Sequence, residues 1–277
     1  MNNNEERYKP TNDYIFSRIF GHKKNWELLK DLLEAILPHI QIKNILLVKQ
    51  FSLAKQTMRN KGGTLDILAI LNDDTKVNIE MQVTDLKNTI ERSLFYDAGI
   101  YHESLYKNEN YKNAPRVIGI WILDYNLFDD GPFHEIAKLK REYENTVLTD
   151  KMELHYIQLP KFKEKCKRIS SKLEQWLTFI INDNTEEVKM IDNEFVQKAE
   201  EELEYLNSDE EERELAKMRE MAEWDWNATM ASAKEEGIEE GEKKQKIETA
   251  RKMLKEKLDI ELIMKITELT EDEIKEL

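Results

Sequence analysis

Two acidic residues and one amide in neighbouring strand-like segments have the types and spacing for metal-assisted chemistry. Glu80 and Gln82 alternate with apolar residues in VNIEMQV, residues 77–83, and Asp66 interrupts the apolar segment TLDILAIL, residues 64–71. Strict alternation over seven residues is typical of a β-strand with one apolar and one polar face. Glu80 and Gln82 therefore project from the same face of the expected strand.

The two carboxylates can share a divalent cation if the two strands pair as a hairpin. Held a few ångströms apart, Asp66 and Glu80 repel each other unless a proton or a cation lies between them. Their carboxylates provide only oxygen ligands, and these favour a hard ion such as Mg²⁺. Such an ion keeps several waters and accepts a phosphate oxygen, so it can activate water against a phosphodiester.

Strand register decides whether the two carboxylates meet. A loop of two or four residues between the strands would place Asp66 opposite Met81, on the wrong face, whereas three or five residues, or a bulge, would place it opposite Glu80 or Gln82. We therefore expect an odd-length connection, or a bulged or splayed pair, at residues 71–76. In the alternative interpretation, Asp66 opens its strand as an exposed end residue and the two polar side chains face solvent.

The elements that position these residues follow a mixed α/β order. Helices are expected from a cap at Thr11 or Asn12, after Asn25 and over 88–107, and strands over 42–51, 64–71, 76–83, 116–126 and 152–159. In the helix over 88–107, the apolar stripe is Ile90, Leu94, Ala98, Tyr101 and Leu105. This order predicts an α/β fold with one mixed central sheet.

Charge divides the chain into unlike parts. The chain has a net charge of −14; residues 1–182 hold 27 basic and 25 acidic residues, and residues 183–277 hold 15 and 31. Only the first part could approach a polyanion without strong repulsion. We expect an α/β domain at 1–182, an acidic helical segment at 183–232, a charged helical linker at 233–258 and a small helix-turn-helix-like module at 259–277.

The net charge of the last module argues against DNA binding by it. Residues 259–277 contain two Lys and seven acidic residues, a net charge of −5. A capping or oligomerisation module is the preferred interpretation. In it, Asp259 caps the first helix, and Thr270 with Glu273 forms a capping box for the second.

Several classes of protein lack support in the sequence. The longest apolar run, VIGIWIL at 117–123, is too short to cross a bilayer, and the first residues show no apolar segment of a signal peptide. The single cysteine, Cys166, fits a reducing cytosol, so we expect a cytoplasmic protein. No phosphate-binding, serine hydrolase or zinc motif is present, and the five His have no ligand spacing.

Four segments resemble, in order, the Rpn family of recombination-promoting nucleases, also called PD-(D/E)XK nuclease family transposases. They are TNDYIFSRIFG, DILAIL with VNIEMQV, ERSLFYDAGIYHESL and RVIGIWILDYNLF, and the text from AKEEGIEEGEKKQ to the end resembles the tail of many members. The resemblance covers most of the chain. It implies a restriction-endonuclease-like αβββαβ core and cleavage of DNA phosphodiesters with Mg²⁺ or Mn²⁺.

The resemblance also implies roles for particular residues. Asp66 and Glu80 match the two motif acids, and Gln82 stands where the general pattern has Lys. The backbone carbonyl of Met81 would be a third metal ligand. A Gln amide can hydrogen-bond water or phosphate, but it carries no charge and cannot act as a base, so activation would rest more heavily on the metal.

Three accessory residues match other family positions. Asp13, in the first helix, could approach the site, or be only a favourable charge at a helix N-terminus. Arg92 and Tyr96 lie four residues apart on the helix over 88–107 and could touch a phosphate, or serve only the surface or the packing. Lys55, Arg59 and Lys61 are further candidate cations near the site.

Two functional hypotheses follow. The first is a Mg²⁺-dependent DNA endonuclease that acts in recombination, mobile elements or defence, binds DNA through residues 1–182, and works as a homodimer because cutting two strands commonly uses two active sites. The second is a non-catalytic scaffold with the nuclease fold, whose acidic tail binds a protein partner. Convergence of Asp66, Glu80 and Gln82 beside cationic groups would favour the first.

Overall fold

The computed structural model describes residues 7–52, 64–85, 87–105, 108–182 and 185–277. Two compact units divide the chain, residues 1–219 and residues 220–277. The first unit contains the whole sheet and every predicted site residue.

Two helices open the first unit as expected. They are α1 (Asp13–Phe20) and α2 (Trp26–Ile36), joined through the 3₁₀ turn Lys23–Asn25. Of the two candidate caps for α1, Asn12 is the one whose side chain accepts a hydrogen bond, from the Ile15 N–H over 3.2 Å. Four buried apolar residues of α1 face the core, Ile15, Phe16, Ile19 and Phe20.

A six-stranded mixed sheet confirms the predicted fold class. Its strands lie in the order β1 (Ile45–Ser52), β2 (Thr64–Leu71), β3 (Lys76–Gln82), β4 (Val117–Leu123), β8 (Met152–Gln158) and β5 (His134–Lys138). The pairs β3–β4 and β4–β8 are parallel, and the others are antiparallel. Three short strands were not predicted, β5 and the two-stranded ribbon of β6 (Lys140–Arg141) and β7 (Thr146–Val147), because their segment is polar and largely exposed.

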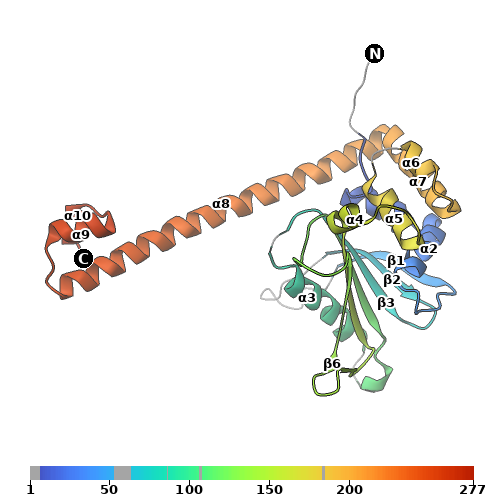
Figure 1. Ribbon diagram of the computed structural model, residues 1–277, viewed down its shortest axis with the longest axis horizontal. Helices are drawn as coiled ribbons and strands as arrows, with labels where there is room; N and C mark the ends of the chain where they lie inside the picture. The colour runs from blue at the N-terminus through green and yellow to red at the C-terminus, as the bar shows by residue number, and fades with distance from the viewer. Residues whose placement is uncertain (1–6, 53–63, 86, 106–107, 183–184) are drawn as a thin grey trace, which may run out of the picture. The chain divides into compact units, whose positions relative to one another are not determined.

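The two faces of the sheet are covered unequally. The main core lies between the sheet and a helical layer that includes α1, α2, α5 (Lys172–Ile181) and α7 (Glu194–Ser208). On the other face lies α3 (Thr89–His102), over smaller clusters that contain Leu68, Trp121 and Tyr156. Figure 1 shows α3 on one side of the sheet and α2, α5 and α7 on the other. Two short helices, α4 (Leu159–Lys165) and α6 (Thr185–Lys189), complete the layer.

Helix α3 packs with an unexpected side toward the sheet. Its buried residues are Thr89, Ser93, Asp97 and Ile100. Two members of the apolar stripe, Ile90 and Leu94, are 41% and 46% exposed, and Ala98 is exposed as well. A rule that buries the apolar face of a helix therefore gives the wrong rotation for α3, because its polar side chains find partners under the helix.

One buried carboxylate ties the far edge of the sheet to the loop after α2. Glu153 on β8 accepts hydrogen bonds from His155 Nε2 at 2.8 Å and Arg116 Nη2 at 3.2 Å. It also pairs with His39 Nε2 at 3.1 Å and Lys138 Nζ at 3.2 Å. These partners hold the pKa of Glu153 at about 2 against the opposing effect of burial. Histidines without sequence spacing are thus brought together by a carboxylate.

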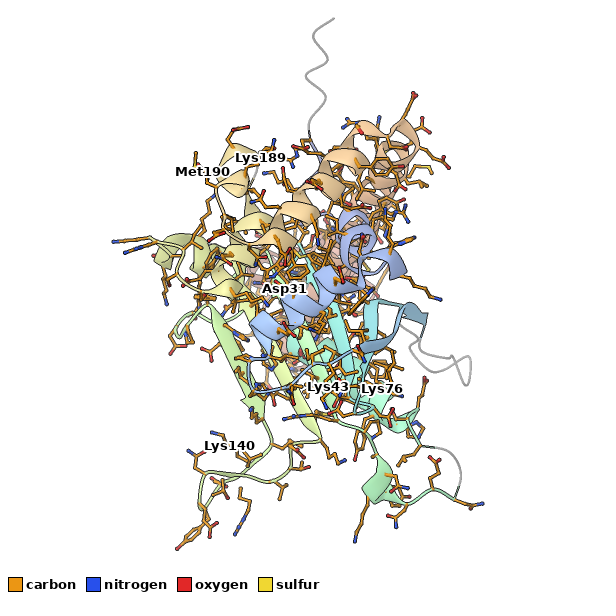
Figure 2. All side chains as sticks on the ribbon, turned by 90° about the vertical axis from the view of Figure 1, so that its right-hand side faces the viewer. Asp31, Lys43, Lys76, Lys140, Lys189 and Met190 are labelled. Atoms are coloured by element: carbon orange, nitrogen blue, oxygen red, sulfur yellow. The ribbon has the colours of Figure 1, made fainter. Side chains whose placement is uncertain are left out.

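The sheet has two ends of different character. Figure 2 shows Lys43, Lys76 and Lys140 toward its lower end, where β3 begins. Because Gln82 ends β3, the candidate site lies at the opposite end. None of the helices in the described ranges is long and apolar enough to cross a membrane.

The C-terminal part is helical. Helix α8 (Glu210–Lys255) is continuous through Gly237 and Gly241, in the segment predicted to be a charged helical linker. In the second unit α9 (Ile260–Thr267) and α10 (Glu271–Lys275) pack with the end of α8 around the buried residues Ala250, Ile263, Leu269 and Ile274. The capping box of Thr270 and Glu273 is confirmed. Asp259 occupies the N-cap position of α9, but its side chain makes no capping hydrogen bond, which corrects that expectation.

Candidate active site

The loop between β2 and β3 has the odd length that the register argument requires. The Leu71 N–H donates to the Thr75 carbonyl over 2.9 Å, so the loop contains three residues, 72–74. Asp74 has a φ of 63°, in the left-handed region that closes a three-residue hairpin loop. The prediction of an odd-length connection is confirmed.

This register places the two candidate acids on one face of the sheet. Ile67 lies opposite Ile79 in the antiparallel pair. Continued by one residue on each strand, the same register puts Asp66 opposite Glu80. Directly opposed residues of an antiparallel pair point to the same side, so the two carboxyl groups share the face that α3 covers.

Asp66 is held by the backbone of the neighbouring strand. Its Oδ2 accepts a hydrogen bond from the Met81 N–H over 2.9 Å. Burial raises the pKa of Asp66 to about 6; the Met81 N–H opposes the rise, and the negative charge of Asp13 adds to it. A carboxyl group in this state exchanges its proton for a cation readily near neutral pH.

Glu80 is the most unusual residue of the site. Its side chain is completely buried, and neither carboxyl oxygen has a hydrogen-bond partner of good geometry, although the Asp66 backbone N–H is near enough to lower the pKa of the carboxyl group slightly. Burial, and then the charge of Asp66, raise the pKa of Glu80 well above its ordinary value. A buried carboxylate without partners is costly, so a native structure that retains one calls for a proton or a cation there.

Gln82 is oriented from two sides. Its Nε2 donates to the Met81 carbonyl over 3.0 Å, and its Oε1 accepts from Arg92 Nη1 over 2.9 Å. The carbonyl that was expected to be a metal ligand is therefore already an acceptor. It keeps a second lone pair, because a backbone carbonyl has two.

Arg92 contacts Gln82, whereas Tyr96 contacts Arg92 and packs against the apolar clusters under α3, so these positions are compatible with both of their alternatives. Arg92 Nε donates to the Tyr96 hydroxyl over 3.3 Å. The guanidinium lies 5.3 Å from the ring centroid of Tyr96 and 5.8 Å from that of Trp121. The centroids of these two rings are themselves 6.0 Å apart, so the guanidinium lies against an aromatic pair that holds it beside Gln82.

The position of Asp13 is compatible with both roles considered for it, an approach to the site and a favourable charge at a helix N-terminus. It is the first residue of α1, where a negative charge is favourable, and it is close enough to Asp66 to raise the pKa of that carboxyl. Its Oδ2 also accepts a hydrogen bond from Arg219 Nε over 2.8 Å. Arg219 opposes the rise in the Asp66 pKa, and no motif in the sequence pointed to it.

Two buried polar residues beside the site were missed from the sequence. Asp97 Oδ1 accepts a hydrogen bond from Asn78 Nδ2 over 3.3 Å, while Asp97 Oδ2 and Asn78 Oδ1 have no partner. Asp97 raises the pKa of Glu80 further. The only available signal was that Asp97 lies four residues after Ser93 on the same helix face.

The donor set fits a hard cation that keeps its own water. The described residues contain no group of three or more His, Cys, Asp or Glu placed to hold a metal ion. Two carboxylates and one carbonyl nevertheless match Mg²⁺, which takes few protein ligands and retains waters. The unpartnered oxygens of Glu80 are the observation that supports the fit.

Comparison with known families identifies the larger part of the chain. Residues 10–233 match the model of the PD-(D/E)XK nuclease family transposases. The chain belongs to this family. Residues 243–277 match the model of the C-terminal HTH domain of the Rpn/YhgA-like nuclease family, so both halves of the expected resemblance are confirmed. Neither the curated proteins nor the solved structures include a match.

All predicted site residues fall inside the region that matches the PD-(D/E)XK nuclease family transposases. The structure brings Asp66 and Glu80 together and sets Gln82 at the end of the same strand, with Arg92 bonded to it. The candidate cations Lys55, Arg59 and Lys61 lie outside the described residues.

Proposed function

We propose that this chain is a metal-dependent endonuclease that hydrolyses DNA phosphodiester bonds. The observation that supports this proposal most directly is the register of β2 and β3, which faces Asp66 with Glu80 while both Glu80 oxygens lack a partner. Membership of a nuclease family makes phosphodiester hydrolysis the reaction to test first.

Asp66, Glu80 and the Met81 carbonyl are the groups that would hold Mg²⁺ or Mn²⁺. When bound, such an ion would lower the pKa of a coordinated water and stabilise the negative charge that develops on the phosphate. Asp66, whose pKa burial raises to about 6, and Glu80, whose pKa is raised well above its ordinary value, must both give up their protons to bind it.

Gln82 and Arg92 would together do what a motif Lys does in one side chain. Gln82 supplies a polar group that can orient a water or a phosphate oxygen, but no charge. Arg92 supplies the positive charge, and its guanidinium donates a hydrogen bond to the Gln82 amide oxygen. Its planar group can also donate two hydrogen bonds to a phosphate.

DNA is the proposed substrate and partner of the first unit. The net charge of residues 1–182 is close to zero, so approach to a polyanion is not opposed there. The match of residues 243–277 to an HTH domain supports DNA binding by the family at this end, although residues 259–277 carry a net charge of −5 here. A cytoplasmic location, suggested by the single cysteine, fits such a substrate.

Nicking of a supercoiled plasmid tests the proposal. We expect Mg²⁺ to support nicking by the full chain, and EDTA, Asp66→Asn or Glu80→Gln to abolish it. Asp150→Asn is a matched control, because Asp150 is exposed just before β8, at the other end of the sheet. Cleavage that survives EDTA and Asp66→Asn, or no cleavage with Mg²⁺ or Mn²⁺, would contradict the proposal.

A further inference from the structure

A pocket of about 310 Å³ lies between the end of α4, the segment that follows it and the end of α5. Figure 1 shows α4 and α5 next to each other in the helical layer. The lining of the pocket contains none of the predicted site residues. Its volume is at the lower end of the range of ligand pockets, about 300–1,000 Å³, so it has room for one small organic group.

The segment after α4 turns back toward the end of that helix. The Cys166 N–H donates to the Phe162 carbonyl over 2.8 Å, and the chain then leaves α4 in an extended conformation. The Cys166 thiol donates to the Arg168 carbonyl over 3.6 Å, and a capping box at Ser171 begins α5. This short connection brings Lys167 and Arg168 to the pocket.

Positive charge gathers at this pocket. Lys163, Lys167 and Arg168 line it, and all three are exposed. Within the described part of the chain, none of these three side chains has an ion pair or a hydrogen bond. The carboxylate in the lining belongs to Glu187, and its Oε2 accepts a hydrogen bond from Asn182 Nδ2 over 2.8 Å. The lining therefore has a net positive charge, in a chain whose net charge is −14.

Apolar side chains make up much of the remaining lining. They are those of Phe162, Ile169 and Ile181. Cations beside apolar side chains fit a ligand that joins an anionic group to a carbon-rich one. The anionic group that suits these cations is a phosphate, because a guanidinium can donate two parallel hydrogen bonds to it and each Lys adds a point charge.

Lys163 links the pocket to the end of the sheet at which the candidate site lies. Burial raises the pKa of Asp124, and the charges of Lys9 and Lys163 oppose the rise, so Lys163 lies close to Asp124. The Asp124 N–H in turn donates to the Gln82 carbonyl over 2.9 Å. A DNA strand that passes Gln82 can therefore continue toward the positive charge of Lys163.

We infer that this pocket binds a nucleoside phosphate, with the phosphate held by Lys163, Lys167 and Arg168 and the sugar against the apolar side chains. The nucleotide belongs either to the DNA strand that passes the candidate site or to a free nucleotide. The first source rests on the proposed function, and the second does not.

The single cysteine makes occupancy of the pocket measurable in the full chain without metal. Cys166 lines the pocket and is partly exposed. Burial raises the pKa of its thiol, and the charge of Glu174 adds to the rise, so labelling by iodoacetamide, a neutral reagent, is best followed at about pH 9 in EDTA.

Deoxyadenosine 5′-monophosphate and a short DNA duplex are the two probes, each in its own arm. We expect a bound probe to slow the labelling of Cys166 about tenfold at about ten times its dissociation constant, because only the empty pocket reacts. Sodium chloride at the same ionic strength should leave the rate unchanged. Protection by the duplex alone assigns the pocket to DNA, and protection by the mononucleotide alone assigns it to a free nucleotide.

A double variant tests whether the cations hold the probe. Lys167→Gln with Arg168→Gln should lose the protection. Lys140→Gln with Arg141→Gln is the matched control and should keep it, because it removes the same two exposed residue types from β6, toward the lower end of the sheet in Figure 2. A rate of labelling without probe that equals that of the wild type shows that the pocket is still formed.

Two results overturn the inference. The first is labelling that neither probe slows, or that sodium chloride slows equally. The second is protection that persists in Lys167→Gln with Arg168→Gln. Plasmid nicking does not enter this measurement, so a failure of the nuclease proposal and a failure of this inference are distinguishable.

Discussion

Arg92 Nη1 on α3 donates a hydrogen bond to Gln82 Oε1 at the end of β3 over 2.9 Å. This contact joins β3, the strand of Glu80 and Gln82, with α3, the helix that packs on this face of the sheet. A positive charge therefore stands next to Gln82, although it comes from a different element.

The contact predicts that Arg92 matters more for rate than for stability. We expect Arg92→Ala to lower plasmid nicking by about 100-fold, the effect of losing one well-placed donor to a developing negative charge. Arg92→Lys should lie between the two, because it keeps the charge but loses the planar group. Arg141→Ala, on the exposed ribbon of β6 and β7, is the control and should cleave normally. Full activity in Arg92→Ala would remove Arg92 from the mechanism.

Glu80 should lower the stability of the metal-free fold because its carboxyl group is placed to bind a cation. Glu80→Gln keeps the shape of the side chain and removes a carboxyl group whose charged form is buried without partners, so the metal-free protein should gain up to about 1–3 kcal/mol at pH 8, according to how far Glu80 is ionised there. The gain should shrink at pH 5, where the raised pKa of Glu80 keeps its carboxyl protonated. Thermal unfolding at the two pH values measures this difference.

The same variant should lose its affinity for divalent cations. Isothermal titration with Mg²⁺ should show binding by the wild type and none by Glu80→Gln. A variant that is less stable than the wild type at pH 8, or that still binds Mg²⁺, would contradict this account of Glu80.

Asp97 should make the stability of the fold depend on pH. Burial raises the pKa of Asp97 from 3.8 to about 7, against a smaller lowering by Asn78. The folded chain then holds a proton that the unfolded chain has lost, so this contribution is fully present below about pH 4 and disappears as the pH rises through 7. Denaturant unfolding between pH 4 and 8 should show the decline, which Asp97→Asn should reduce and Asp150→Asn should not. An unchanged pH dependence in Asp97→Asn would show that Asp97 does not titrate in this range.

Gly119 should be required because Asp97 occupies the space above it. A Cβ at this position would lie 1.9 Å from Asp97 Oδ2 and 3.0 Å from a methyl carbon of Leu154. Gly119→Ala should therefore destabilise the fold by about 1–3 kcal/mol, the usual cost of overpacking a core. In the double variant Gly119→Ala with Asp97→Ala, the loss should be smaller than the sum of the single losses, as a double-mutant cycle can measure. Simple additivity would mean that the two residues do not share this space.

Local sequence patterns predicted much of the fold and the two strands at the centre of the candidate site. The alternation in VNIEMQV and the interrupted apolar run around Asp66 gave β2 and β3, and the odd-length loop followed from asking how Asp66 could face Glu80. Strand β5 and the ribbon of β6 and β7 were not predicted because their residues are polar. An edge strand such as β5 needs no apolar pattern when the neighbouring strand forms hydrogen bonds with its backbone.

By itself, the sequence determined on which strands Asp66, Glu80 and Gln82 lie, and it predicted that they bind a cation, because side-chain alternation along a strand is a property of the local backbone. Only the tertiary structure decided that Arg92 donates a hydrogen bond to Gln82, that Asp97 lies buried beside Glu80, and that α3 turns Ile90 and Leu94 to solvent. These facts depend on contacts between segments far apart in the chain, and the rotation of α3 is set by partners such as Tyr156 and Asn78, which no pattern within the helix contains.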